Sequence, residues 1–229
     1  MNKIVSLILA AGSSTRMGQP KQLLKWGDYT LLDHAIETVL EANTHEVILV
    51  LGSNFELINK TIKNHGVTIL YNKNWTQGLG TSIACGAHYI SNSIPNIDGV
   101  LLVLADQPLI DSHYLKSMIK NFVPNNKQIM ATLYNNGKQG VPVLFDKHYI
   151  EELLNNFNWD TNFKSFENSS IQKLLFNNTQ LSGSQSSSYF DYSKSILNRI
   201  TNNLPYIYKT KGTKNSFELV RNISEYHHK

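Results

Sequence analysis

The stretch LILAAGSSTRMGQPKQLL, residues 7–24, decides the fold of this chain. It completes an apolar run, residues 3–10, whose β-branched and leucine side chains are typical of a buried strand. The run ends in three small residues, which are followed by three hydroxyl residues and then by two cations on either side of Pro20. Such a turn, placed directly after a strand, can direct its backbone N–H groups at a ligand and suits a polyphosphate. The alternative is an ordinary strand-to-helix turn with surface cations.

The turn combines three kinds of residue. The small residues, which let the backbone approach a ligand, are Ala10, Ala11 and Gly12. The hydroxyl residues are Ser13, Ser14 and Thr15, and the cations are Arg16 and Lys21. The turn is not a P-loop, because Gly18 is followed by Gln-Pro-Lys rather than by Lys and a hydroxyl residue. It also lacks the G-x-G-x-x-G pattern of dinucleotide-binding folds.

An export signal is a second interpretation of the same opening. Lys3 would be its charged region, residues 4–9 its apolar region and residues 10–12 its cleavage site. The apolar run is at the short limit for such a region, and its β-branched residues suit a strand better. One cysteine, Cys85, allows no disulfide within the chain, and no apolar run approaches the roughly 18 residues of a membrane span. We therefore expect a cytoplasmic protein without a membrane partner.

Length and composition restrict the class of protein. The 229 residues suffice for one large domain, or for one domain with an appendage. Hydrophobic residues make up 41% of the chain, which allows a sizeable core. The net charge of +4 is small and the lysines are scattered, so a nucleic-acid surface is not indicated. A small anionic ligand fits this charge better.

Apolar runs alternate with segments of helical periodicity along most of the chain. The expected strands are residues 3–10, 47–51, 67–71, 100–105, 129–134 and 141–145. The expected helices are residues 31–40, with Thr30 and Asp33 as a capping pair, 55–64, stopped by Gly66, 81–90, 111–122, capped by Asp111, 149–157 and 193–200. Continuous Val/Ile/Leu strands separated by helices predict a parallel sheet covered on both faces.

The stretch ADQP, residues 105–108, ends the most apolar strand. In open α/β sheets, ligands bind beyond the carboxyl ends of the strands. Asp111 already fits as the cap of the next helix, so Asp106 is available as a metal ligand. With a nucleoside triphosphate present, Mg²⁺ needs one or two carboxylates from the protein.

A glycine-rich stretch, NKNWTQGLGTSIACG at residues 72–86, runs into a helix. Ser82 fits a contact to a ribose or base and Trp75 fits the wall of a pocket; the alternative is a surface loop with Trp75 in the core. Cys85 has no neighbouring cation to lower its pKa, so we interpret it as a packing residue rather than a nucleophile. A fourth stretch, GVPVLF at residues 140–145, is by itself a turn and a strand.

Together the four stretches resemble one family, the MobA-like nucleotidyltransferases, and within it the molybdenum cofactor cytidylyltransferases. Residues 9–24 resemble the pattern L-A-A-G-x-S-x-R-M-G…P-K-x-L-L, residues 105–108 the metal-binding strand end, and residues 140–145 the G-x-P-x-L-F segment. Five residues of this chain resemble the family's second loop: Asn74, Trp75, Gly78, Ser82 and Gly86. The resemblance covers about residues 1–157. It implies a three-layer Rossmann-like α/β fold with a mostly parallel central sheet.

The resemblance also implies a reaction, the transfer of a nucleoside monophosphate from NTP to a phosphorylated acceptor with release of pyrophosphate. Arg16 and Lys21 would hold the triphosphate, while Asp106 and Asp191 would bind Mg²⁺. The implied nucleotide-binding residues are Leu9, Ala10, Ala11, Gly12, Ser13, Ser14, Lys21, Asn72, Gly78 and Ser82. LAAG followed by Pro-Lys resembles the cytidylyl branch of the family, which favours CTP over GTP. Molybdopterin as the acceptor rests on the resemblance alone.

The resemblance weakens toward the carboxyl terminus. Residues 167–171, ENSSI, stand where the family often shows G-D-x-G-A. Residues 189–195, YFDYSKS, stand where it shows D-I-D-T-P-E-D, so that Asp191 alone keeps an acid. We expect residues 1–200 to form the NTP transferase domain and residues 201–229 a carboxyl-terminal extension.

Three functions stay open at this point. The first is a CTP-dependent transferase that acts on molybdopterin or a related phosphorylated acceptor. The second is a nucleotide-binding accessory protein that serves a molybdoenzyme or its maturation without turnover, an alternative motivated by the altered Asp191 segment. The third is a nucleotidyltransferase for a sugar phosphate or an alcohol phosphate on the same scaffold.

Overall fold

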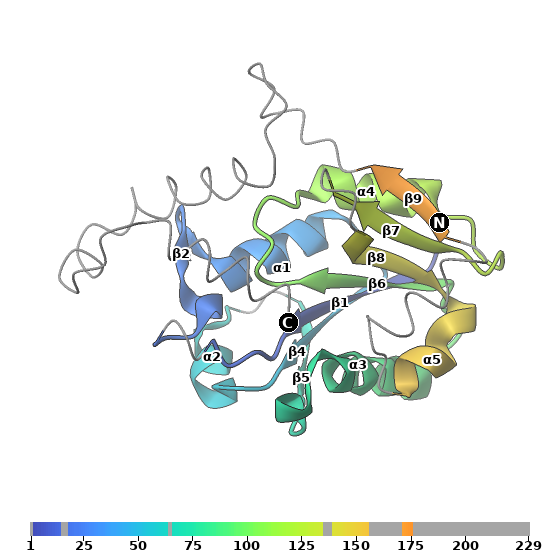
Figure 1. Ribbon diagram of the computed structural model, residues 1–229. Coiled ribbons are helices and arrows are strands. Elements are labelled where there is room, and N and C mark those ends of the chain that lie inside the picture. The colour runs from blue at the N-terminus through green and yellow to red at the C-terminus, as the bar shows by residue number, and fades with distance from the viewer. Residues whose placement is uncertain (1, 15–17, 64–65, 135–138, 156–170, 176–229) are drawn as a thin grey trace, which may run out of the picture.

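A seven-stranded sheet forms the centre of the protein (Figure 1). The structure is a computed structural model, and it describes residues 2–14, 18–63, 66–134, 139–155 and 171–175. The strand order is β5-β4-β1-β6-β8-β7-β9. The strands are β1 (Ile4–Ala10), β4 (Glu46–Leu51), β5 (Thr68–Tyr71), β6 (Gly99–Leu104), β7 (Ile129–Leu133), β8 (Gln139–Asp146) and β9 (Ile171–Leu175). All pair in parallel except β8, which runs antiparallel to both β6 and β7. The expected mostly parallel sheet is therefore confirmed.

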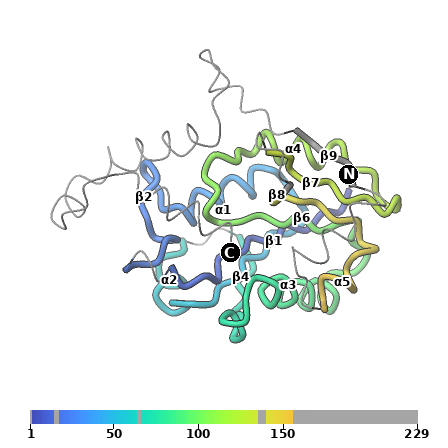
Figure 2. Tube along the Cα trace, in the orientation of Figure 1, coloured from blue at the N-terminus to red at the C-terminus, as the bar shows by residue number. Residues whose placement is uncertain are grey.

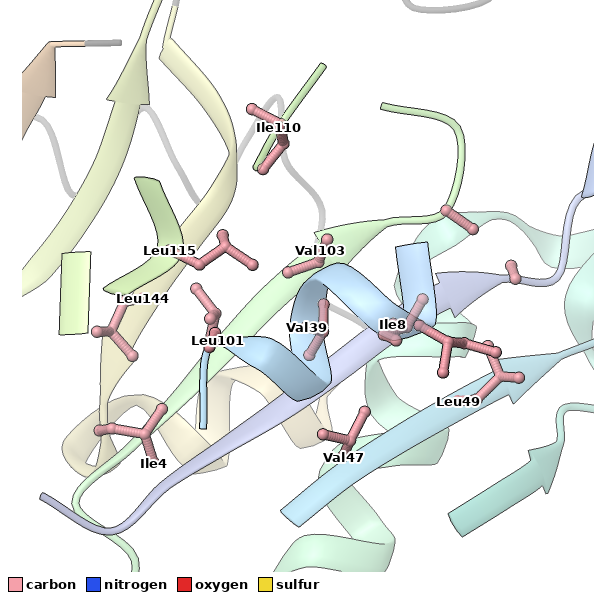
Figure 3. Packing of buried hydrophobic residues seen from close by; sticks show 14 of the residues in the cluster. Ile4, Ile8, Val39, Val47, Leu49, Leu101, Val103, Ile110, Leu115 and Leu144 are labelled. Carbon is pink, nitrogen blue, oxygen red and sulfur yellow. The ribbon is translucent and has the colours of Figure 1, made fainter. Parts of the chain in front are cut away.

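Helices cover both faces of this sheet and make the fold three-layered. They are α1 (Leu31–Glu41), α2 (Phe55–Thr61), α3 (Leu79–Ser93), α4 (Ser112–Asn121) and α5 (Ile150–Leu154). Helices α1, α2 and α4 share one apolar core with the sheet, and α3 and α5 share the other. Figure 3 shows the first core, in which Val39 of α1 and Leu115 of α4 lie over Ile8 and Leu101 of the sheet.

The central strand β1 shows why the opening stretch decides the fold. Its residues are 0–5% exposed, because strands on both sides and helices on both faces cover it. Alternate side chains enter opposite cores: Ile4 and Ile8 face one, and Val5 and Leu7 face the other. The expected buried strand is thus confirmed.

The expected helix caps are also confirmed. The Thr30 hydroxyl accepts a hydrogen bond from the Asp33 backbone N–H at 3.0 Å and donates one to the Asp33 carboxylate at 2.8 Å. The Asp111 carboxylate accepts from the Tyr114 N–H at 2.8 Å. These bonds satisfy N–H groups that the first turn of a helix leaves without a partner.

Some boundaries differ from expectation for local reasons. Helix α2 ends at Thr61 rather than at residue 64, because Ile62 turns extended and packs against the first core. Helix α3 begins two residues earlier than expected, directly after Gly78, whose φ of 105° suits glycine. Helix α5 begins at Ile150, one residue later than expected, because Tyr149 is the last residue of a 3-10 helix, Lys147–Tyr149.

Three short strands have no counterpart among the expected elements. The first two, β2 (Lys25–Trp26) and β3 (Tyr29–Thr30), form a hairpin around Gly27, which has a φ of 60°. The third, β9, pairs in parallel with β7 at the edge of the sheet. The helix expected at residues 193–200 lies outside the described residues. Among the described residues, the helices are too short or too polar to cross a bilayer.

Candidate active site

Those predicted site residues that the structure describes gather at one edge of the sheet, where the parallel strands end. Strand β1 lies between β4 and β6, with Ala10 beside Leu51 and Leu9 beside Leu104. The segments that follow these three strands therefore leave the sheet together, as Figures 1 and 2 show for β1 and β6. We call this side the carboxyl edge. It is the edge at which ligands bind in open α/β sheets.

Lys21 and Asp106 form an ion pair at the carboxyl edge, although 85 residues separate them. Lys21 begins the 3-10 helix Lys21–Leu23, and Asp106 follows the end of β6. The Lys21 Nζ donates directly to the Asp106 Oδ2. The two side chains are 19% and 13% exposed, so both are within reach of solvent and of a ligand. The structure thus brings together two residues for which the sequence predicted catalytic roles.

The turn after β1 is held by hydrogen bonds from two directions. On the side of β4, the Ser53 N–H donates to the Ala11 carbonyl at 3.0 Å. On the other side, the Lys21 N–H donates at 3.0 Å to the hydroxyl of Ser14, a buried residue with a φ of 54°. The side chains of Leu9, Ala10 and Ala11 are themselves buried. Any contact of these three residues with a ligand would therefore come from their backbone.

Gln22 lies at the candidate site and was not among the predicted residues. Its side-chain Nε2 donates to the Ala10 carbonyl at 2.7 Å and to the Gly12 carbonyl at 3.0 Å. The residue is 1% exposed, and its Oε1 has no hydrogen-bond partner among the described residues. The available signal was a polar residue between Lys21 and the apolar pair at residues 23 and 24, which by itself does not show where its amide points.

Close packing fixes the same turn against β4. A Cβ atom on Gly52 would lie 2.8 Å from both the Cβ and the carbonyl oxygen of Ala11, and 2.5 Å from the Cβ of Trp75. Such distances are too short for any side chain, so Gly52 permits the close approach of the two segments. The half-buried Trp75 is thereby placed beside the turn, at the carboxyl edge.

The second loop is braced by Asn72. Its Nδ2 donates to the hydroxyls of Thr81 at 2.9 Å and Ser82 at 3.0 Å, and its Oδ1 accepts from the Asn74 N–H at 2.9 Å. Asn72 is 4% and Ser82 2% exposed. These two residues therefore hold the start of α3 against β5. Nucleotide binding by Asn72, Gly78 and Ser82 stays a prediction.

The segment that carries Asp106 is anchored on both flanks. The Gln107 Nε2 donates to the Tyr134 hydroxyl at 2.9 Å and to the Val141 carbonyl at 3.1 Å, while its buried Oε1 has no partner among the described residues. On the opposite flank, the Nε2 of His34 in α1 lies 3.0 Å from the Pro108 carbonyl oxygen. The two residues that follow Asp106 are thus both held in place.

The residues present fit a divalent cation with oxygen ligands. Asp106 supplies an accessible carboxylate, and Mg²⁺ or Mn²⁺ needs only one or two of these when phosphates and water complete its coordination. The described part of the chain holds no cluster of three or more His, Cys, Asp or Glu side chains suited to a metal. Arg16 and Asp191, also predicted for this site, lie outside the described residues.

Cys85 lies half-buried in α3. Burial raises the pKa of its thiol, so the side chain stays protonated and weakly nucleophilic near neutral pH. This agrees with the interpretation of Cys85 as a packing residue.

Comparisons with known proteins identify relatives of this chain. The chain is 35% identical to the nicotine blue oxidoreductase of Paenarthrobacter nicotinovorans over 108 residues, which are 46% of this chain and 50% of that protein. It is 30% identical to the molybdenum cofactor cytidylyltransferase of Escherichia coli K12 over 148 residues, which are 64% of this chain and 72% of that enzyme. The chain therefore spans half of the first relative and nearly three quarters of the second.

Solved structures show the same fold. The crystal structure of Rv0371c from Mycobacterium tuberculosis in complex with manganese superposes with a TM-score of 0.64 at 23% identity, covering 84% of this chain and 97% of that one. The sequence profile of the MobA-like NTP transferase domain matches residues 6–169 and so includes the turn after β1, Asn72 and Asp106. This chain belongs to the MobA-like NTP transferase family.

Proposed function

We propose that the protein is a nucleotidyltransferase that moves CMP from CTP onto the phosphate of an acceptor, molybdopterin cofactor, and releases pyrophosphate. The observation that carries this proposal is the meeting of Lys21 and Asp106 beside the turn after β1. Phosphoryl transfer needs a cation that binds the phosphates and a carboxylate that binds a metal ion. In this protein Lys21 and Asp106, which can supply these two charges, are in direct contact.

In this reaction an oxygen of the acceptor phosphate attacks the α-phosphorus of CTP. The bond to the β-phosphate breaks, and pyrophosphate leaves with the electron pair. The acceptor phosphate is largely ionised at neutral pH, because its second pKa is about 6. The reaction therefore needs no strong general base, and the protein contributes positioning and charge stabilisation.

Lys21 and Arg16 would supply the positive charge. The Lys21 ammonium would hold the triphosphate and stabilise the negative charge that grows on the leaving pyrophosphate. Loss of one such cation is expected to raise the barrier by about 2–4 kcal/mol. The N–H groups of residues 11–14 would add hydrogen bonds to the phosphates. Backbone N–H groups bind phosphates in this way in other turns that follow a strand.

Asp106 and Asp191 would hold Mg²⁺. When bound there, the ion would neutralise phosphate charge and polarise the α-phosphate as a Lewis acid. The manganese complex of the structural neighbour from Mycobacterium tuberculosis supports a divalent cation on this fold. Asp106 would also keep Lys21 oriented toward the phosphates through their ion pair.

Two observations support the choice of CTP and molybdopterin. The turn reads LAAG and is followed by Pro-Lys, as in the cytidylyl branch of the family. The 30% identical relative from Escherichia coli is named molybdenum cofactor cytidylyltransferase. We assign the transferase domain to residues 1–200 and an extension to residues 201–229.

A second candidate is nucleotide binding without transfer. The 35% identical relative is named for an oxidoreductase activity rather than for nucleotidyl transfer, so the family scaffold is not confined to one reaction. In such a protein the turn after β1 would bind the nucleotide, and no pyrophosphate would be released. The protein would then serve a molybdoenzyme or its maturation as an accessory factor.

Release of pyrophosphate separates these candidates. The full chain would be incubated with Mg²⁺ and CTP, GTP, ATP or UTP, with and without molybdopterin, and with a panel of sugar phosphates and alcohol phosphates. Pyrophosphate formed from CTP only when molybdopterin is present would support the proposal. Binding of CTP by calorimetry without pyrophosphate from any acceptor would favour the accessory function. Release with a sugar phosphate instead would move the chain to the third function.

A further inference from the structure

Gln22 is a buried polar residue at the carboxyl edge. It has no role in the chemistry proposed above. It is the second residue of the 3-10 helix that begins at Lys21, and it is 1% exposed. Its amide nitrogen contacts two backbone carbonyl oxygens of the turn after β1, those of Ala10 and Gly12. Carbonyl oxygens only accept hydrogen bonds, so the NH₂ group must face them and the amide cannot be flipped.

The contacts of Gln22 determine where the backbone N–H groups of the turn point. Across a trans peptide bond, the C=O of one residue and the N–H of the next point in opposite directions. Gln22 draws the carbonyls of Ala10 and Gly12 toward itself and so turns the N–H groups of Ala11 and Ser13 away from itself. The Lys21 N–H, one residue before, holds the hydroxyl of Ser14. The short helix thus fixes the turn at three alternate residues.

The oxygen of the same Gln22 amide also bears on the role of this contact. Oε1 is buried and has no partner among the described residues. A buried acceptor without a partner is unfavourable, and those kept in native structures need an explanation. Local conflicts of this kind concentrate at functional sites, where geometry is favoured over stability.

We propose that Gln22 is a positioning residue of the phosphate site. Its amide holds the Ala10 and Gly12 carbonyls so that the N–H groups of Ala11 and Ser13 face the triphosphate of the nucleotide. The same helix directs the Lys21 side chain to Asp106, so one three-residue element sets both the hydrogen-bond donors and the cation. This inference rests on the proposed function, because it needs a triphosphate in the turn.

The test compares Gln22→Met with Gln128→Met in the full chain. Both glutamines are buried, at 1% and 2% exposure, but Gln128 lies at the opposite edge of the sheet, where its Oε1 accepts from the Val123 N–H at 2.8 Å. We expect Gln22→Met to weaken binding of the NTP with Mg²⁺ by about tenfold or more and to raise its KM, with the KM of the acceptor unchanged. Gln128→Met should lower the melting temperature and leave NTP binding as it is.

Gln22→Asn is the second variant, for use if Gln22→Met does not fold. It keeps the amide but is one methylene too short to reach both carbonyls, so it should weaken NTP binding in the same way. NTP binding that is unchanged in either folded variant, while wild-type protein binds, would overturn the inference alone. Failure of wild-type protein to bind any NTP would overturn the proposed function and this inference with it.

Discussion

The buried polar groups that we compare at the two edges of the sheet differ in their hydrogen bonds. Asp146, at the end of β8 and 1% exposed, lies at the edge opposite the candidate site. Its oxygens accept from the N–H and the ring nitrogen of His148, at 3.1 Å and 2.6 Å, and from the Asn126 N–H at 3.1 Å. At the carboxyl edge, the buried Oε1 atoms of Gln22 and Gln107 have no partner within the described part of the chain.

This difference agrees with a structural role for Asp146 and with the roles proposed for the two glutamines at the carboxyl edge. A buried acceptor without a hydrogen bond destabilises the fold by about 1–3 kcal/mol, so a purely structural edge is expected to satisfy its groups, as the Asp146 edge does. At the carboxyl edge, the amide nitrogens of the two glutamines hold the segments that carry Lys21 and Asp106, and we propose that this is why their Oε1 atoms lack partners among the described residues. Glu152 Oε2 in α5 is a third buried oxygen without a partner among the described residues, and we find no functional reason for it.

The largest effect is expected from Asp106→Asn. This change removes the charge proposed to hold the metal and the partner of Lys21, and it should lower the rate of pyrophosphate release by about 100- to 1,000-fold. Asp111→Asn is the matched control, because asparagine is as good a helix cap as aspartate and Asp111 only caps α4. Equal rates for Asp106→Asn and wild-type protein would show that the carboxyl edge is not the catalytic one.

Gly52→Ala should affect both stability and binding. The new methyl group would meet the backbone and Cβ of Ala11 at 2.8 Å, and neither can move without displacing the turn. Overpacking of this kind destabilises by about 1–3 kcal/mol, which denaturant unfolding measures. NTP binding should weaken as well, which calorimetry measures.

The control for this variant is Gly99→Ala at the start of β6, at the opposite edge of the sheet. There the methyl group would meet the Phe145 carbonyl oxygen, 2.6 Å away, and not the turn after β1. It should lower stability with NTP binding intact. If both variants weaken NTP binding to the same extent, overpacking beside the turn affects NTP binding no more than overpacking elsewhere.

Tyr134→Phe should have a smaller effect. The change removes the hydroxyl that donates to the Val141 carbonyl and accepts from Gln107, and so loosens the segment that carries Asp106. We expect a loss of about 1 kcal/mol in stability and a few-fold lower kcat in the pyrophosphate assay. Tyr149→Phe removes a comparable bond at the opposite edge, to the Lys127 carbonyl at 2.9 Å, and should change stability without changing kcat.

The smallest effect concerns pH and the Asp146 edge. Burial acts to raise the pKa of Asp146, but the hydrogen bonds from His148 and Asn126 and the His148 charge outweigh it, so this pKa lies below its ordinary value. A carboxyl with a lowered pKa stabilises the fold above its ordinary pKa, about 3.9, and this contribution is lost as the pH falls through the lowered value. Urea unfolding between pH 6 and pH 3 should show that loss.

His148→Ala removes the main cause of the lowered pKa, so its stability should depend less on pH over the same range. His88→Ala, an exposed residue of α3, is the control and should follow wild-type protein. A pH dependence that is identical in all three proteins would contradict the role given to His148.

The sequence predicted those parts of the molecule that depend on regular patterns. Strand β1 and the meeting of Lys21 with Asp106 follow from apolar runs and from the rule that parallel strands end at one edge. Strand β9, with the sequence IQKLL, has no such pattern, because its pairing with β7 arises only in the folded sheet. Gln22 was missed for a related reason: its amide reaches back to residues 10 and 12, and no sequence rule gives the path of an irregular turn.

The reversed direction of β8 has a consequence for substrate choice. Because β8 runs against β6 and β7, the connection that leaves β7 at Leu133 and enters β8 at Gln139 starts and finishes at the same edge as Asp106. A change of chain length between these two strands is therefore expected to act at the edge that carries Asp106, without shifting the register of any core strand. Under the proposed function, we expect such changes to alter acceptor preference and to leave the turn after β1 unchanged.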